Sequence, residues 1–170
     1  PGARTNVWVF TYCPPTSIGN YAFYECSNLN SVTIPNTVKT IGDQSFYLCS
    51  SLKNIDVDSE NTEFSSVDGV LYNKDISTLI RFPEAKTEIS AIPNSVTAIG
   101  NKAFKNCIGL TSITIPNSVT TIGDQAFAGC SGLTSIALPN SVTAIENKAF
   151  YGCHNLTTVT IPNSIKTIGD

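Results

Sequence analysis

The chain has 170 residues, of which 41% are hydrophobic and only 14% are charged, and its formal net charge is -3 at pH 7. This composition can fill a folded core and argues against disorder. It lacks the basic surface that binds nucleic acids and anionic membranes, and no apolar run approaches the roughly 20 residues of a membrane-spanning helix. We therefore expect no nucleic-acid partner and no membrane insertion.

A repeat of 23 residues runs along the chain. It is marked by five phenylalanines that are each followed three residues later by a cysteine, namely Phe23, Phe46, Phe104, Phe127 and Phe150. A period of this length is typical of solenoids, in which each coil buries its apolar side against the next. Residues 1–170 are therefore predicted to form a single repeat array of about six full coils and a partial one.

Three parts of the array depart from the regular repeat. Residues 6–28 form a degenerate first repeat, residues 52–86 form a longer variant repeat without the Phe-x-x-Cys signature, and residues 156–170 form a truncated last repeat. The truncated coil leaves apolar surface and strand edges uncovered. We therefore expect the natural chain to continue past it, and the isolated chain to self-associate weakly end to end.

The variant repeat contains two apolar runs, Val70–Tyr72 and Leu79–Phe82, which are separated by the polar stretch Asn73–Thr78. This pattern predicts a hairpin, which we expect to protrude from the array. Because it is the one surface that does not repeat, it is our second candidate binding site, with the residues Tyr72, Asn73 and Lys74. The alternative is a purely structural variant coil.

The regular repeat that begins at Leu110 predicts two elements. Apolar residues spaced from Leu110 indicate a short strand that Pro116 ends. Asp124 is predicted to N-cap a short helical turn that buries Phe127. The equivalents of Asp124 in the other repeats are Asn20, Asp43, Asn101, Asn147 and Asp170.

Three motifs recur in this order: Leu-x-x-Ile-x-Ile-Pro, Val-x-x-Ile-Gly and Ala-Phe-x-x-Cys. Together they resemble the BspA-like leucine-rich repeats of bacterial and protozoan surface proteins, from Val9 to Asp170. The resemblance implies a repeat solenoid: a curved, right-handed stack of coils with a parallel concave sheet and short helical or irregular convex segments. It also implies an extracellular or cell-surface protein that acts in adhesion or host contact, with its targeting signal outside this sequence.

Residues suited to catalysis or metal binding are scarce. The only histidine, His154, occupies a loop position at which other repeats carry serine, so no nucleophile and base are expected to meet. Cys49, Cys107, Cys130 and Cys153 recur at one position of the repeat, which favours reduced, shielded packing residues. The redox state of Cys13 stays open. No cysteine spacing fits zinc. We therefore expect no enzyme, no metal and no cofactor.

The outward-facing positions of the predicted strands form a polar, nearly uncharged strip. We select as ligand-binding candidates the residues Thr111, Ser112, Thr114, Thr134, Ser135, Thr157, Thr158 and Thr160. Solenoids commonly bind partners on an extended concave surface of this kind. The sequence therefore indicates a non-enzymatic module that binds a protein or glycan.

Two other interpretations of the strip stay open. Threonine and serine are also good strand residues on a solvated face, so the chain can be a structural spacer or self-assembling array without a dedicated ligand. Thr111, Thr134 and Thr157 are also expected to stack at strand spacing, as an ice-binding face requires, although Lys53 interrupts that column.

Overall fold

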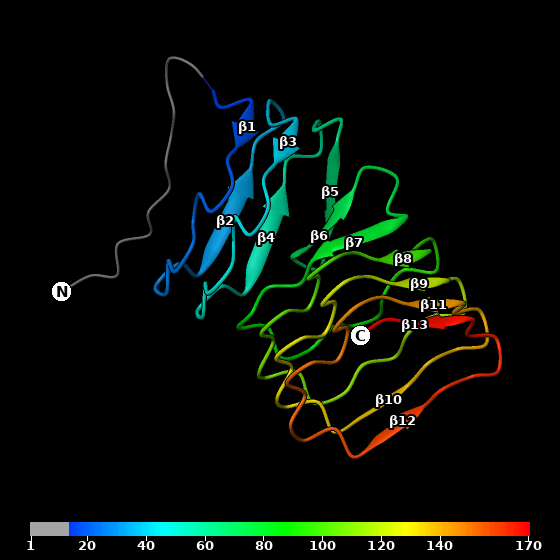
Figure 1. Ribbon diagram of the computed structural model, residues 1–170. Helices are drawn as coiled ribbons and strands as arrows, with labels where there is room; N and C mark the ends of the chain where they lie inside the picture. Colours follow the sequence, from blue (N-terminus) through cyan, green and yellow to red (C-terminus); the bar gives the residue numbers. More distant parts are fainter. Residues whose placement is uncertain (1–13) are drawn as a thin grey trace.

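The computed structural model describes residues 14–170, and all regular secondary structure in this range is β-strand. The chain forms a β-solenoid of about seven turns, which stack from the first coils at β1 to the last at β13 (Figure 1). The strands are β1 (Ser17–Ile18), β2 (Ser31–Ile34), β3 (Thr40–Ile41), β4 (Asn54–Val57), β5 (Phe64–Val67), β6 (Val70–Asn73), β7 (Thr78–Arg81), β8 (Ala98–Ile99), β9 (Thr121–Ile122), β10 (Ser135–Ala137), β11 (Ala144–Ile145), β12 (Thr158–Thr160) and β13 (Thr167–Ile168). The first part of repeat 6–28 and Cys13 lie outside the described residues.

One set of short strands ends at the isoleucine of the Ile-Gly step in each regular repeat, a step that reads Ile145-Glu146 in one of them. These strands pair in parallel and join residues one repeat apart, such as Ser17 with Thr40 in β1 and β3, and Thr121 with Ala144 in β9 and β11. Four of them, β8, β9, β11 and β13, belong to a seven-stranded sheet with the order β13-β11-β9-β8-β7-β6-β5. The hydrogen-bond register therefore follows the sequence period.

The strands predicted from the Leu-x-x-Ile-x-Ile run form only in part. They appear as two separate pairs, β2 with β4 and β10 with β12. The ladder stops after β4 because the edge of β4 that would meet the next coil is already bonded: the N–H of Ile55 donates to the carbonyl of Gly69 at 2.8 Å. The expected continuous sheet on this face is interrupted by the variant repeat.

Within the variant repeat, β5, β6 and β7 form an antiparallel meander. Asp68 and Gly69 join β5 to β6, and both have positive φ (51° and 68°), as a type I′ turn requires. A side chain on Gly69 would also collide with Asn54 of β4, since an added Cβ would lie 2.3 Å from its Oδ1. The meander is part of the seven-stranded sheet, so the expected protrusion is wrong (Figure 1).

The core consists of two hydrophobic clusters that meet at β6. Leu71 packs into the N-terminal cluster, whereas its neighbours Val70 and Tyr72 pack into the C-terminal one, because successive side chains of a strand point to opposite faces. Phe127 is fully buried, as the sequence predicted, and its ring stacks on that of Phe104 at a centroid distance of 4.8 Å.

The segments that carry the Ala-Phe-x-x-Cys motif, which we call the spine, are not helical. The residue after each Asn or Asp position is left-handed, with φ between 51° and 58° at Tyr21, Gln44, Lys102, Gln125 and Lys148. Alternate amides then bond to the next coil, as when the N–H of Lys102 donates to the carbonyl of Asp124 at 2.8 Å. These bonds between coils replace the bonds within a segment that a helix would need.

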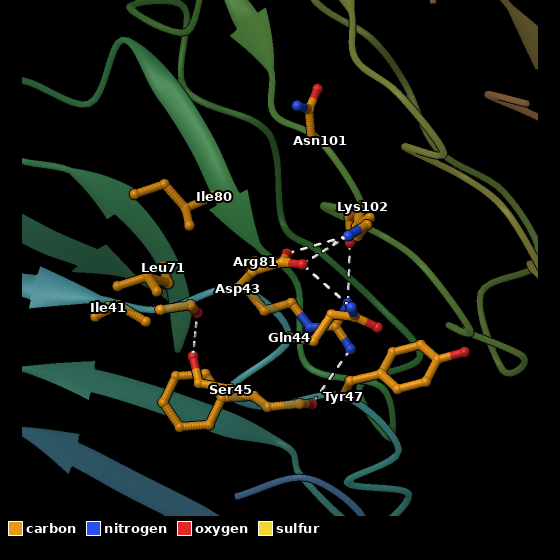
Figure 2. A pocket seen from close by; sticks show the side chains of 12 residues that line it. Ile41, Asp43, Gln44, Ser45, Tyr47, Leu71, Ile80, Arg81, Asn101 and Lys102 are labelled. Atoms are coloured by element: carbon orange, nitrogen blue, oxygen red, sulfur yellow. Dashed lines mark hydrogen bonds and ion pairs between the residues drawn. The ribbon is translucent and has the colours of Figure 1, made fainter. Parts of the chain in front are cut away.

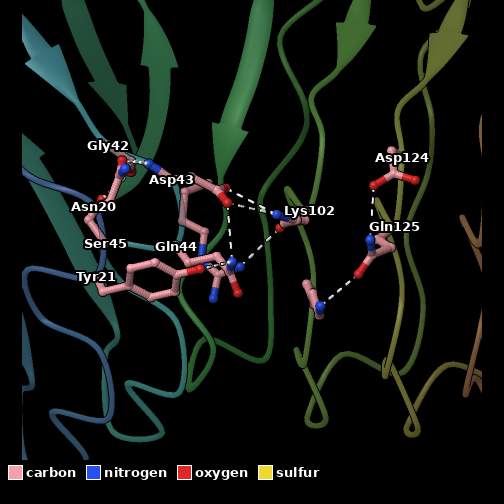
Figure 3. Close-up of polar contacts among 11 residues, drawn as sticks. Asn20, Tyr21, Gly42, Asp43, Gln44, Ser45, Lys102, Asp124 and Gln125 are labelled. Atoms are coloured by element: carbon pink, nitrogen blue, oxygen red, sulfur yellow. Dashed lines mark hydrogen bonds and ion pairs between the residues drawn. The ribbon is translucent and has the colours of Figure 1, made fainter.

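The predicted N-cap role of the Asn and Asp column is therefore wrong. Each asparagine instead accepts a bond from the backbone of the following coil. Asn20 Oδ1 accepts from the N–H of Asp43 at 2.8 Å (Figure 3). Asn101 Oδ1 likewise accepts from the N–H of Asp124 at 3.0 Å. The column fixes the stacking of adjacent coils.

The cysteines of the spine are free thiols that pack against the preceding coil. Cys49, Cys107 and Cys130 are buried as predicted, while Cys153 is half-buried and Cys26 is exposed. Cys130 Sγ donates to the carbonyl of Phe104 at 3.0 Å. Burial raises the pKa of Cys49 to about 11 and that of Cys130 to about 12, so both stay protonated near neutral pH.

Candidate functional site

The strip predicted from the sequence is a solvent-exposed surface. All eight candidate residues are exposed: Thr111, Ser112, Thr114, Thr134, Ser135, Thr157, Thr158 and Thr160. Those of the last two coils lie on or directly before β10 and β12, where Ser135 pairs with Thr158. The structure therefore brings hydroxyl groups from successive coils together on one face.

The threonines of this strip also hold the coils in register. Thr134 Oγ1 donates to the carbonyl of Thr111 at 3.4 Å, and Thr157 Oγ1 donates to the carbonyl of Thr134 at 3.1 Å. These two hydroxyls keep their lone pairs free to accept bonds from a ligand. Ser135 and Thr158 have no side-chain hydrogen bond within the described part of the chain, so they can both donate and accept.

The second candidate site, at the turn between β6 and β7, consists of structural residues. Tyr72 is only 1% exposed, so the expectation of a ligand contact there is wrong. Asn73 Oδ1 accepts from the backbone N–H groups of Ser77 and Thr78, which holds the turn. Lys74 Nζ donates to the carbonyl of Asn61. All three side chains stabilise the variant coil.

A cleft of about 200 Å³ opens where the variant repeat shortens the spine (Figure 2). Ile41, Leu71 and Ile80 form part of its apolar wall, and Asp43 and Lys102 lie across it from neighbouring regular coils. Asp43 Oδ2 and Lys102 Nζ are 2.9 Å apart. Partial burial alone would raise the pKa of Asp43, but hydrogen bonds from Lys102 and Gln44 outweigh it and lower this pKa.

Arg81 and Glu84 reconnect the two coils on either side of this cleft. Arg81 Nη2 donates to Glu84 Oε1 at 2.6 Å, and Arg81 Nη1 donates to the carbonyl of Lys102 at 2.9 Å. Glu84 Oε1 also accepts from the N–H of Leu48 at 2.9 Å, in place of the carbonyl that a regular coil would supply. Burial raises the pKa of Glu84, while Arg81 and the Leu48 amide oppose this rise.

The sequence analysis missed Arg81 and Glu84. Two opposite charges three residues apart, in a chain with so few charges, were the available signal. Their role depends on the gap left by the short spine segment, which the sequence does not display.

Side chains suited to chemistry remain dispersed in the described range. Among residues 14–170, no group of three or more His, Cys, Asp or Glu side chains is placed to hold a metal ion. His154 is exposed in its loop. The same range contains no helix with the length and apolar character needed to cross a bilayer.

Comparison with known proteins identifies the repeat. The family model for the BspA type leucine rich repeat region matches residues 16–91 and 81–170, with six copies. The chain belongs to this family. No curated protein matches it.

Solved structures of related repeat proteins share the fold. The pneumococcal vaccine antigen PcpA is 33% identical, with a TM-score of 0.83 over 94% of this chain and 40% of that protein. A leucine rich cell surface protein from Faecalibacterium prausnitzii is 29% identical, with a TM-score of 0.66 over 88% of this chain and 46% of that one. A leucine-rich repeat protein from Eubacterium ventriosum is 28% identical, with a TM-score of 0.62 over 91% and 60%. The chain spans less than two thirds of each.

Proposed function

We propose that the chain is a non-enzymatic binding or adhesion module of a cell-surface or secreted protein, and that it binds a protein or glycan through the hydroxyl strip. The exposed, uncharged hydroxyls on successive coils carry this proposal. A surface of this kind offers many weak hydrogen bonds at a fixed spacing, which suits an extended ligand with repeated polar groups.

Two similar structures support a location at the cell surface. One similar structure is described as a vaccine antigen and another as a cell surface protein. The buried thiols, with raised pKa values, are poor nucleophiles, which fits binding rather than catalysis.

A screen of protein and glycan arrays tests the strip, with a matched control on another face of the same coils. The test variant replaces Thr111, Thr134 and Thr157 by Ala. The control variant replaces Thr97, Thr120 and Thr143 by Ala; these threonines are also exposed and also donate to the preceding coil. The test variant loses two bonds between coils and the control variant loses three, so a loss of binding in the test variant alone reports on ligand contact.

We expect a partner that the wild type and the control variant bind and the test variant does not. Its affinity should change little with salt, because the strip carries no charge. A partner that binds both variants equally removes the strip as its site. A wild type that binds nothing in the arrays favours the structural spacer instead.

A further inference from the structure

A second open surface lies on the spine, away from the hydroxyl strip. It is a groove of about 700 Å³ that runs across several coils, from Tyr47 in the second repeat to Tyr151 in the sixth. Lys105, Gln125 and Lys148 also line it. Neither the proposed function nor the family resemblance assigns a role to this groove.

The groove is hollow because small residues occupy positions where other coils carry large ones. The residue after the spine phenylalanine is Tyr47 in one coil and Ala128 in another, and the next residue is Leu48 in one coil and Gly129 or Gly152 in others. Leu48 and Gly152 occupy equivalent left-handed positions, with φ of 58° and 74°. A Cβ on Gly152 would meet its nearest atom at 3.6 Å, so there is room for one, but its φ of 74° is a left-handed conformation that favours glycine.

The groove is positively charged in a protein of net charge -3. Its lining contains two lysines and no Asp or Glu. Within the described residues, neither lysine has a carboxylate within 4 Å, since the ion pairs there involve only Arg81, Lys86 and Lys102. Lys105 Nζ instead lies 4.9 Å above the ring of Tyr47 and donates to Gln125 Oε1 at 2.7 Å. Lys148 is exposed, and the Lys105 ammonium has N–H donors beyond the one that it gives to Gln125, so each can still bind an anion.

The aromatic and polar groups of the lining suit a sugar better than a peptide. Tyr151 is 72% exposed, so a sugar ring can stack on it. Asn106, Gln125 and Ser131 offer hydrogen-bond donors and acceptors beside it. Ala128 is the only aliphatic side chain of the lining, so the groove lacks the apolar pockets that anchor peptide side chains.

We propose that this spine groove binds a linear acidic oligosaccharide built from uronic acid units. Lys105 and Lys148 belong to the fourth and sixth coils, whose backbones are separated by about 10 Å along the array at the spacing of stacked strands. A chain with a carboxylate on every ring can reach both lysines, whereas a glycan with one terminal acid reaches one. One sugar ring stacks on Tyr151. The small lining residues Ala128, Gly129 and Gly152 let the oligosaccharide approach the protein backbone.

The test is calorimetric titration of the folded chain with tetragalacturonic acid at low salt. The fully methyl-esterified tetrasaccharide keeps the sugar rings and removes the charges, and tetraglutamate keeps the charges and removes the rings. We expect saturable binding of the acidic sugar only, with affinity that falls as salt is added.

Two variants locate the site. Lys105→Gln with Lys148→Gln should weaken binding about tenfold, and glutamine already occupies the position of Lys148 in other coils, at Gln44 and Gln125. Tyr151→Ala should weaken it about fivefold. The control is Lys53→Gln with Lys166→Gln, which changes the net charge equally at exposed positions outside the groove and should leave the affinity unchanged.

Three results would each overturn the proposal: absence of saturable binding at millimolar sugar, equal binding of the esterified sugar or of tetraglutamate, or unchanged affinity in the groove variants. The alanine variant of Thr111, Thr134 and Thr157 should bind the acidic sugar normally. This separates the groove from the hydroxyl strip, so that either proposal can fail alone.

Discussion

Replacing Phe127 by Ala should test how far each coil depends on the aromatic column. The ring is fully buried and lies between Phe104 and Phe150, at centroid distances of 4.8 Å and 5.4 Å. Removing a buried phenylalanine costs about 3–5 kcal/mol, and two stacked neighbours place this site near the upper end of that range. Urea denaturation followed by circular dichroism measures the loss of unfolding free energy.

Phe150→Ala is the matched control, because the same residue at the same repeat position is only partly buried. Among the spine phenylalanines it stacks on Phe127 alone, so its replacement should cost about half as much. A loss below about 1 kcal/mol for Phe127→Ala, or a larger loss for Phe150→Ala, would refute the reasoning.

Three further predictions concern the charged and sulfur groups. Glu84→Ala should cost about 3–5 kcal/mol in urea denaturation, because it leaves the guanidinium of Arg81 buried without its anion; a loss under about 1 kcal/mol contradicts this. The pKa of Asp43 is lowered below its ordinary value of 3.8, so the folded chain takes up this proton at lower pH than the unfolded chain. The stability that ionised Asp43 contributes should therefore be present above pH 3.8 and lost as the pH falls through the lowered pKa. Lys102→Gln should make the unfolding free energy fall less over this pH range. An equal fall in the wild type and the variant would argue against the ion pair. Cys130, whose pKa is raised to about 12, should resist a thiol reagent under native conditions, and rapid labelling would show that the spine opens.

The repeat period predicted the register of the coils and the burial of Phe127, because both depend on residues that recur at fixed spacing. It did not predict the left-handed backbone conformation of the spine. Asn or Asp before a short segment suits an N-cap equally well, and Gln125 and Lys148 are not residue types that favour positive φ. Their left-handed conformation is imposed by hydrogen bonds to the next coil, which are contacts between residues far apart in sequence.

The variant repeat was predicted only in part for a different reason. The hairpin of β6 and β7 follows two apolar runs that the sequence shows plainly. The Asp68-Gly69 turn was an equally strong local signal for pairing β5 with β6, but the polar Ser65 and Ser66 hid the strand before it. For the binding strip, alternation along the strands indicated which side chains face outward, but no pattern in the sequence identifies a ligand.

Asn and Asp alternate from coil to coil in this column, so the array has a second period, of two coils. In the last four coils the column reads Asn101, Asp124, Asn147 and Asp170. The Oδ1 of each asparagine accepts a hydrogen bond from the backbone N–H of the aspartate in the next coil. Loss of one coil from this series would place two aspartates or two asparagines at adjacent positions of the column, and adjacent aspartate side chains would repel each other. Loss or gain of coils in pairs keeps the alternation intact. Recombination between repeats should therefore be tolerated most readily in steps of 46 residues, twice the period of the sequence.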